Sequence, residues 1–433
     1  MVGRGTLLVI LGFSLIFGIA GQYWNRESTS AIQNYVQYYG QANVYNIAVA
    51  GADIGCDSLF NDVNASGLSI GGKFAGGNYS VGLVPVTRHS SEYMLQSVGT
   101  YSDYTGDYSD TIQVLLARRS YSQWEFFSMK ENGIYWKTGD TVSGPMATDD
   151  SLYVSGTPVF KGQVSSKLGM SKALRSSPEF LAGCQSGVGY NMASVTPTAS
   201  QASRTFSNTN TSGTYNLYLT LSYNSTNNQT DVSFYSSSTQ GRTTTRVPAS
   251  GDSVLPLQAF APNGVVAVSN GDVHVQGVLA GQLTVVAQQG ALGSSNSGNI
   301  LIDNNITYEN NPLTDPSSTD MLGLVAQNNV TLTASQQSVN IDAAIYAENG
   351  SFTYSGWSST NLGTSAYINL LGSIANYSRG AVGTFSTSTD KTLTGYNKNY
   401  MYDTRLANEA PLDFPYTGTF GVLTWRETPP SMP

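Results

Sequence analysis

The chain has 433 residues, a length that suits two or three structural units with cores of their own. Charged residues make up 11% of it, against about 25% in an average soluble domain, and 27 tyrosines outnumber Phe and Trp together. The net charge is −8 without any cluster of Lys or Arg, which excludes the basic footprint of a nucleic-acid-binding protein. Uncharged polar residues replace the charges, a composition typical of proteins that work outside the cell.

The two cysteines of the chain are Cys56 and Cys184. An even number of cysteines in an exported protein makes a disulfide between them a candidate, and two separate buried thiols are the alternative. The sequence has no CxxC pair and no cluster of residues with metal-ligand spacing. We therefore expect neither a metal nor another cofactor.

An apolar segment runs from Thr6 to Gly21 and follows a single positive residue, Arg4. A helix of 16 residues spans about 24 Å, less than the hydrocarbon core of about 30 Å, so we expect marginal membrane insertion. A cleavable signal peptide and an ordinary membrane anchor are two interpretations of such a segment. Its strongly apolar residues are Leu7, Leu8, Val9, Ile10, Leu11, Phe13, Leu15, Ile16, Phe17 and Ile19.

A helical pattern continues beyond the apolar segment. No proline interrupts residues 22–58, and small or aromatic residues recur at steps of three and four. This pattern predicts one helix over residues 6–60, about 80 Å long, apolar at first and amphipathic later. Gly40 and Gly51 are expected to weaken it. The recurring residues are Ala31, Tyr35, Tyr38, Tyr39, Ala42, Tyr45, Ala48, Val49 and Ala52.

The pair Arg4-Gly5 ahead of the apolar run resembles a prepilin peptidase site, and a single long helix of this kind resembles type IV pilins. The resemblance implies that residues 1–5 are a leader, with Gly5 its last residue and Thr6 the first of the mature chain. Gly3 is a second candidate cleavage site. Major pilins carry Glu at the fifth mature position, where this chain has Ile10.

That departure, with the segments at 39–55 and 402–406, resembles the minor-pilin and pseudopilin group that includes PilX and GspK. The resemblance implies a non-enzymatic filament subunit in the inner membrane before assembly and in an extracellular filament at the cell surface afterwards. The partners implied are copies of the chain or other pilin subunits, and surface glycans are a further candidate. The implied filament-core residues are Leu7, Leu8, Ile10, Leu11, Phe13, Leu15, Ile16 and Phe17.

The remainder of the chain is predicted to be mainly β. Residues 61–200 are predicted to form a β-rich domain packed on the helix. Within it, residues 64–119 alternate short apolar strands with glycine-rich turns, which predicts an antiparallel meander. Residues 201–262, rich in Ser, Thr and Asn, are predicted to form hairpins or a loop. In residues 391–433, we expect Tyr and Pro residues to cap the open end of the domain before them, with Tyr400, Tyr402 and Phe414 as the cover and Asp403 paired with Arg405.

Three similar pieces within residues 263–390 predict a solenoid. They span 266–277, 324–334 and 345–355, and each places a corner at Asn270, Asn328 or Asn349 before an alternating strand. Asn and Gly tolerate the left-handed backbone of a tight corner. Short strands joined in this way indicate a right-handed parallel β-helix. The irregular spacing leaves a β-sandwich as the alternative.

Motifs that could carry chemistry are weak. Gly67–Gly71 matches GxSxG but runs into a glycine-rich segment, not into the helix that a nucleophile elbow requires. The two histidines are His89 and His274, and the carboxylates near Asp103 depart from calcium-loop spacing. We therefore expect no enzyme. The rival hypothesis is a secreted β-solenoid protein that binds carbohydrate or degrades polysaccharide, with a signal peptide cleaved near Gln22.

Overall fold

The computed structural model describes residues 3–61, 67–85, 92–190, 202–207, 213–290 and 297–428. The chain forms two compact units, Met1–Arg119 with Gly418–Pro433, and Ser120–Thr417. It is mainly β with one long N-terminal helix, as predicted. The boundary expected near residue 200 lies after Arg119 instead, and the segment expected to be one cap, 391–433, is divided between the two units.

In the part of the first unit that the structure describes, one helix packs on one five-stranded sheet. Helix α1 (Gly3–Asn61) confirms the predicted long helix. The strands are β1 (Ser69–Phe74), β2 (Gly77–Pro85), β3 (Glu92–Asp103), β4 (Gly106–Ser120) and β31 (Tyr416–Thr428), in the order β1-β2-β3-β4-β31. The first four form the predicted antiparallel meander.

The C-terminal half of α1 packs on this sheet through small residues. A Cβ atom added at Gly55 would lie 2.7 Å from Leu95 and Val81, and one at Gly40 would lie 2.6 Å from the ring of Tyr108. Gly40 and Gly51, which were expected to weaken the helix, therefore allow it to approach the strands closely, as Gly55 does. The core comprises Ala48, Ala52, Leu59, Val81, Leu95, Ile112, Val114, Leu116 and Phe420.

The second unit is a coil of parallel strands, which agrees with a solenoid and not with a sandwich. One face consists of ten parallel strands in the spatial order β14 (Arg204–Ser207), β19 (Val265–Ser269), β21 (Gln282–Gln288), β23 (Met321–Ala326), β25 (Ser338–Ala347), β27 (Tyr367–Ser378), β5 (Phe126–Lys130), β7 (Met146–Thr148), β10 (Val164–Ser166) and β13 (Cys184–Ser186). The right hand of the coil stays a prediction.

Two further faces complete the coil. One contains β15 (Thr214–Asn224), β20 (Asp272–Leu279), β22 (Ile300–Tyr308), β24 (Val330–Leu332) and β26 (Phe352–Tyr354). The other continues from β27 through β30 (Asn397–Tyr402), β6 (Thr141–Val142), β9 (Val159–Phe160) and β12 (Glu179–Phe180). Strands β8 (Leu152–Val154) and β11 (Met170–Lys172) pair with each other.

Hairpins and short helices are attached to the coil. Strands β16 (Gln229–Gln240), β17 (Thr243–Val247) and β18 (Ser253–Pro256) extend β15 as antiparallel hairpins, and β28 (Gly383–Phe385) pairs with β29 (Thr392–Gly395). Helix α2 (Leu257–Phe260) and the 3-10 turns η1 (Tyr121–Gln123) and η3 (Thr404–Ala407) complete the unit.

The corners of the coil carry a ladder of polar side chains. Asn270 has a φ of 58°, the left-handed conformation that the sequence predicted for this corner. One turn further on, Asn299 donates from its backbone and side chain to Asp272, and Asn329 donates in the same way to Asn299. At these corners one coil therefore pairs with the half-buried polar groups of the next, which helps to hold their register.

The order of the coils differs from the order of the chain. Strand β27 lies between β25 and β5, so the early segment 126–186 stacks on the end of the later segment 202–402. An apolar row crosses this joint without interruption. It comprises, in register, Val266, Val285, Leu324, Ile345, Ile374, Phe126, Met146, Val164 and Cys184.

Two buried ion pairs hold the joint between the two segments. Arg379 lies 2.6 Å from Glu131, and Lys398 lies 2.6 Å from Asp140. The guanidinium of Arg379 also stacks over the ring of Trp136, with 4.0 Å between its central carbon and the ring centroid. Because removing one member of a buried pair leaves an uncompensated charge, these pairs fix which strands meet.

The C-terminal segment covers a face of the coil, not its open end. Tyr402 and Phe414 pack with Tyr121 and Trp124 over the outer side of the first face, whereas Tyr400 lies in the coil interior. The predicted cap is therefore wrong in its position, because the outer side of this face is itself apolar and needs a cover. The predicted pairing of Asp403 with Arg405 is confirmed at 2.6 Å.

Candidate functional site

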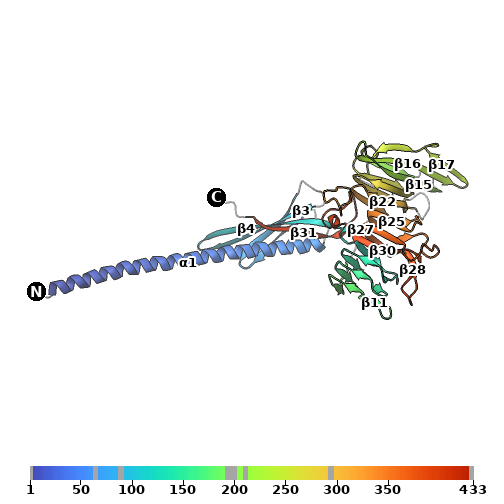
Figure 1. Cartoon of the computed structure of the whole chain (residues 1–433). Helices are drawn as coiled ribbons and strands as arrows, with labels where there is room; N and C mark the ends of the chain where they lie inside the picture. Colours follow the sequence, from blue (N-terminus) through green and yellow to red (C-terminus); the bar gives the residue numbers. More distant parts are fainter. Residues whose placement is uncertain are drawn as a thin grey trace. The chain divides into compact units, whose positions relative to one another are not determined.

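The apolar half of α1 is exposed along its whole length. Its large apolar side chains from Leu7 to Ile19 keep between 57% and 73% of their surface accessible. In Figure 1 this part of α1, in dark blue, extends past the strands of the first unit. A row of exposed large apolar residues of this extent marks a surface for a membrane or a protein partner.

The same half of α1 has the length and composition of a membrane span. An 18-residue window within Gly5–Phe60 has a mean hydropathy of 1.9, and none of it is buried. No charged residue occurs between Arg4 and Arg26, and those 21 positions of helix correspond to about 32 Å. Tyr23 and Trp24, exposed by 62% and 76%, end this stretch with the aromatic residues favoured at a membrane surface.

A second exposed stretch of α1 lies between the apolar half and the packed half. Tyr35 and Tyr38 are exposed by 70% and 71%, and Tyr39 by 54%. The amphipathic face predicted from residues 31–52 is thus buried only in its later part, at Ala48 and Ala52. Within the described chain nothing buries the earlier aromatic residues, and tyrosine side chains are enriched in protein interfaces.

The residues predicted for processing lie at the start of the helix. Gly5 belongs to the first turns of α1, and a Cβ added to it would meet nothing within 4 Å. Thr6 follows it in the same turn. Both lie on the exposed part of α1, so their surroundings leave room for an enzyme, and their role as a cleavage site stays a prediction.

The two cysteines lie in different units, Cys56 in the first and Cys184 in the second. Cys56 is half-buried on the packed half of α1, and Cys184 ends the apolar row of the coil. A disulfide between them stays a prediction.

The motifs weighed for catalysis are not brought together. Ser69 of the GxSxG match begins β1, which continues into β2 and not into a helix. His274 lies in β20 with Nδ1 2.8 Å from the carboxylate of Asp303, and His89 lies outside the described residues. Within the described ranges, no group of three or more His, Cys, Asp and Glu could hold a metal ion.

No protein-family model matches the chain, and no curated protein matches it in sequence. Among solved structures, the chain is similar to the competence-associated pilin ComZ from Thermus thermophilus, with a TM-score of 0.34 and 12% identity. The similarity covers 90% of this chain and 97% of that one. The exposure and packing of α1 itself carry the functional interpretation that follows.

Proposed function

We propose that the protein is a non-enzymatic subunit of a type IV pilus-like filament, assembled through the apolar half of α1. One observation carries this proposal: a single unbroken helix has one half packed on its own sheet and the other half apolar, with every large apolar side chain more than half exposed. In a membrane the exposed half is surrounded by lipid, and in a filament by equivalent helices. Both surroundings are apolar, so transfer between them costs little.

The exposed aromatic residues of α1 extend the proposed contact beyond the membrane segment. Tyr35, Tyr38 and Tyr39 would meet neighbouring subunits once the helix leaves the lipid. The β domains then form the outer coat of the filament. Ile10 offers no carboxylate to a neighbour's new amino terminus, which favours a tip or initiating subunit over a bulk subunit.

The first experiment is N-terminal sequencing of the native protein with Gly5 intact and with Gly5→Leu. We expect a mature chain that begins at Thr6, and an unprocessed, membrane-retained chain for the variant. Gly21→Leu is the control, because a Cβ at Gly21 also meets nothing within 4 Å and the position lies outside the proposed site. Processing that is unchanged in Gly5→Leu would contradict the proposed cleavage.

The second experiment images sheared cell-surface material by electron microscopy. Filaments that contain this chain, and that are absent with Phe13→Arg, are the expected result. An Arg at the centre of a membrane helix costs about 2.5–3.5 kcal/mol of insertion free energy, whereas Phe13→Leu should be silent. A native chain that begins near Gln22 would instead support the rival, a secreted carbohydrate-binding or polysaccharide-degrading protein.

A further inference from the structure

The second unit contains a cavity of about 470 Å³ that the proposed filament role does not use. It lies where the loops after β5 and β26 meet the hairpin β28–β29, next to the joint between the two segments of the coil. Volumes of this order are typical of small-molecule sites, which are mostly apolar with a few polar groups.

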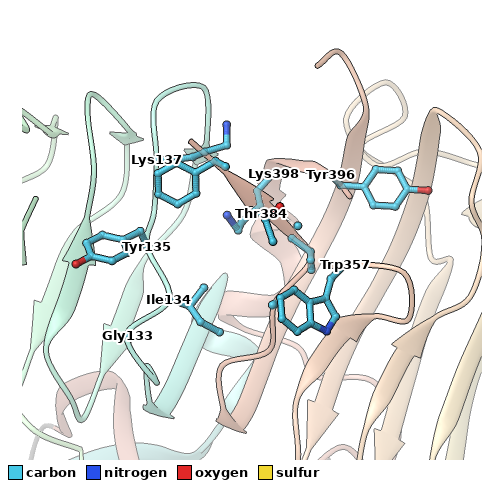
Figure 2. A pocket seen from close by; sticks show the side chains of 12 residues that line it. Gly133, Ile134, Tyr135, Lys137, Trp357, Thr384, Tyr396 and Lys398 are labelled. Atoms are coloured by element: carbon cyan, nitrogen blue, oxygen red, sulfur yellow. The ribbon is translucent and has the colours of Figure 1, made fainter. Parts of the chain in front are cut away.

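Aromatic rings form much of the cavity wall. Tyr135 and Trp357 come from two loops and Phe385 from the end of strand β28. Figure 2 shows Tyr135 and Trp357 on opposite sides, with Thr384 and Lys398 between them in this view. Tyr396 is buried and is held by hydrogen bonds from its hydroxyl to the carbonyl oxygens of Ala334 and Gln336. Trp357 has 40% of its surface exposed, whereas most large aromatic rings of this unit are more deeply buried. Such rings offer flat apolar faces for a ligand to stack on.

The charges at the cavity leave one cation without a carboxylate partner. Arg379 pairs with Glu131, and Lys398 pairs with Asp140. The ammonium of Lys137 donates to two neutral acceptors, the Thr138 carbonyl at 3.0 Å and the Asn397 side-chain oxygen at 2.7 Å. Within the described chain no carboxylate lies within 4 Å of it.

Lys137 is therefore a buried cation with a hydrogen-bond donor to spare. Only 5% of its surface is exposed, and an ammonium has three donors, two of which are used. A buried charge is costly unless an opposite charge pairs with it. A carboxylate that enters the cavity would supply that charge through a strong, charge-assisted hydrogen bond.

We propose that this cavity binds an acidic saccharide, a uronic-acid unit whose ring stacks on the aromatic walls and whose carboxylate pairs with Lys137. The flat walls select a ring with an apolar face, and the unpaired cation selects its acid group. Binding does not depend on filament assembly, because every wall residue belongs to one unit of one chain.

Isothermal titration calorimetry of the full chain in detergent tests this, with digalacturonic acid and its neutral counterpart, digalactose, as probes. We expect the acid to bind at least about tenfold more tightly than the neutral sugar, as a charge-assisted hydrogen bond implies. Lys137→Met should remove this preference, and Trp357→Ala should weaken the binding of both probes. Thermal unfolding of each variant establishes that the fold is kept.

Two matched variants serve as controls. Lys172→Met removes an exposed lysine of the same unit that does not line the cavity, and Trp425→Ala removes a tryptophan of the other unit with the same 40% exposure. Both should bind digalacturonic acid like the parent. The proposal would be overturned if the acid and the neutral sugar bound equally tightly, or if the folded chain did not bind digalacturonic acid. It would also be overturned if hexanoate bound as tightly as digalacturonic acid.

Discussion

Two apolar rows in this molecule have opposite environments. The row on α1 runs from Leu7 to Ile19 with every large apolar side chain more than half exposed, whereas the row in the coil, from Val266 to Cys184, is buried at all but its last member. The coil row finds its partners within the chain because its strands stack in register. Among the described residues the helix row has no such partner, so burial of its surface would have to come from outside the chain.

The free energy of unfolding should distinguish the apolar residues of the two rows. Substitutions in the coil row should change the free energy of unfolding of the isolated chain. Substitutions in the helix row should change insertion and assembly and leave unfolding alone.

The largest effect is expected at the joint where the coil row passes from one chain segment to the other. Arg379→Met would leave Glu131 buried without its partner and should destabilise the second unit by about 3–5 kcal/mol. Arg246→Met is the control, because Arg246 and Asp252 form a pair at the surface, and such pairs contribute about 0–1 kcal/mol. Calorimetric unfolding of the full chain gives both values, and similar losses in the two variants would contradict the assigned role of the joint.

The next largest effect is expected from replacing an isoleucine of the coil row, compared with an isoleucine of the helix row. Ile374 is fully buried between Ile345 and Phe126, so Ile374→Ala should cost about 2–5 kcal/mol in unfolding free energy. Ile16 is 60% exposed, and Ile16→Ala should stay within about 0.5 kcal/mol in detergent. If Ile16→Ala were as destabilising as Ile374→Ala, the helix row would have partners within the chain.

A pH dependence should distinguish the coil from the helix row, which has no titrating group. Glu125 is fully buried next to Phe126, and its burial raises the pKa of the carboxyl group from 4.5 to about 7, against the opposing hydrogen bond from the Gly144 amide. The folded state therefore holds this proton more tightly than the unfolded state. Its contribution to stability is complete below pH 4.5 and is lost as the pH rises to about 7.

Glu125→Gln keeps the shape and removes the charge, so the measurement is the difference between variant and parent. The parent should lose about 2–3 kcal/mol relative to the variant between pH 4.5 and pH 8. Chemical unfolding at these two pH values gives the difference. A variant that follows the parent across this range would show that Glu125 titrates normally.

The smallest effect concerns the two halves of α1. Gly55→Ala should cost about 1–3 kcal/mol, because its new methyl group would lie 2.7 Å from Leu95 and Val81. Gly21→Ala, in open surroundings, should be neutral or gain up to about 1 kcal/mol from helix propensity. Thermal unfolding of the two variants compares them directly, and a stabilising Gly55→Ala would show that the helix does not lie so close to the sheet.

The sequence alone predicted the features that depend on local pattern. Continuous apolar and helix-compatible residues predicted α1, and alternation with turn residues predicted the meander of β1 to β4. The corners at Asn270, Asn328 and Asn349 predicted a coil of short strands, because Asn tolerates the left-handed backbone of a tight corner. Of these three residues only Asn270 has a positive φ, so the coil turns at the other two corners without it. Each of these signals lies within a few residues of the structure that it specifies.

The candidate site was predicted in part. The exposed apolar residues of α1 were found from composition. The cavity was missed, because Tyr135 precedes Trp357 and Phe385 by more than 200 residues in the chain. No spacing pattern links such residues. The unpaired cation could have been noticed only as a lone Lys137 near Trp136, which is not a specific signal.

Tertiary structure alone decided which strands are neighbours. The sequence placed residues 126–186 with the helix, whereas they continue the coil after β27, and it placed β31 in a cap, whereas that strand joins β4 about 300 residues earlier in the chain. Likewise, the role of the glycines of α1 is explained only by the close contact of the helix with the sheet. Local propensity fixes that a segment is a strand or a helix, but the complementarity of buried surfaces and paired charges, summed over the whole chain, selects its partner.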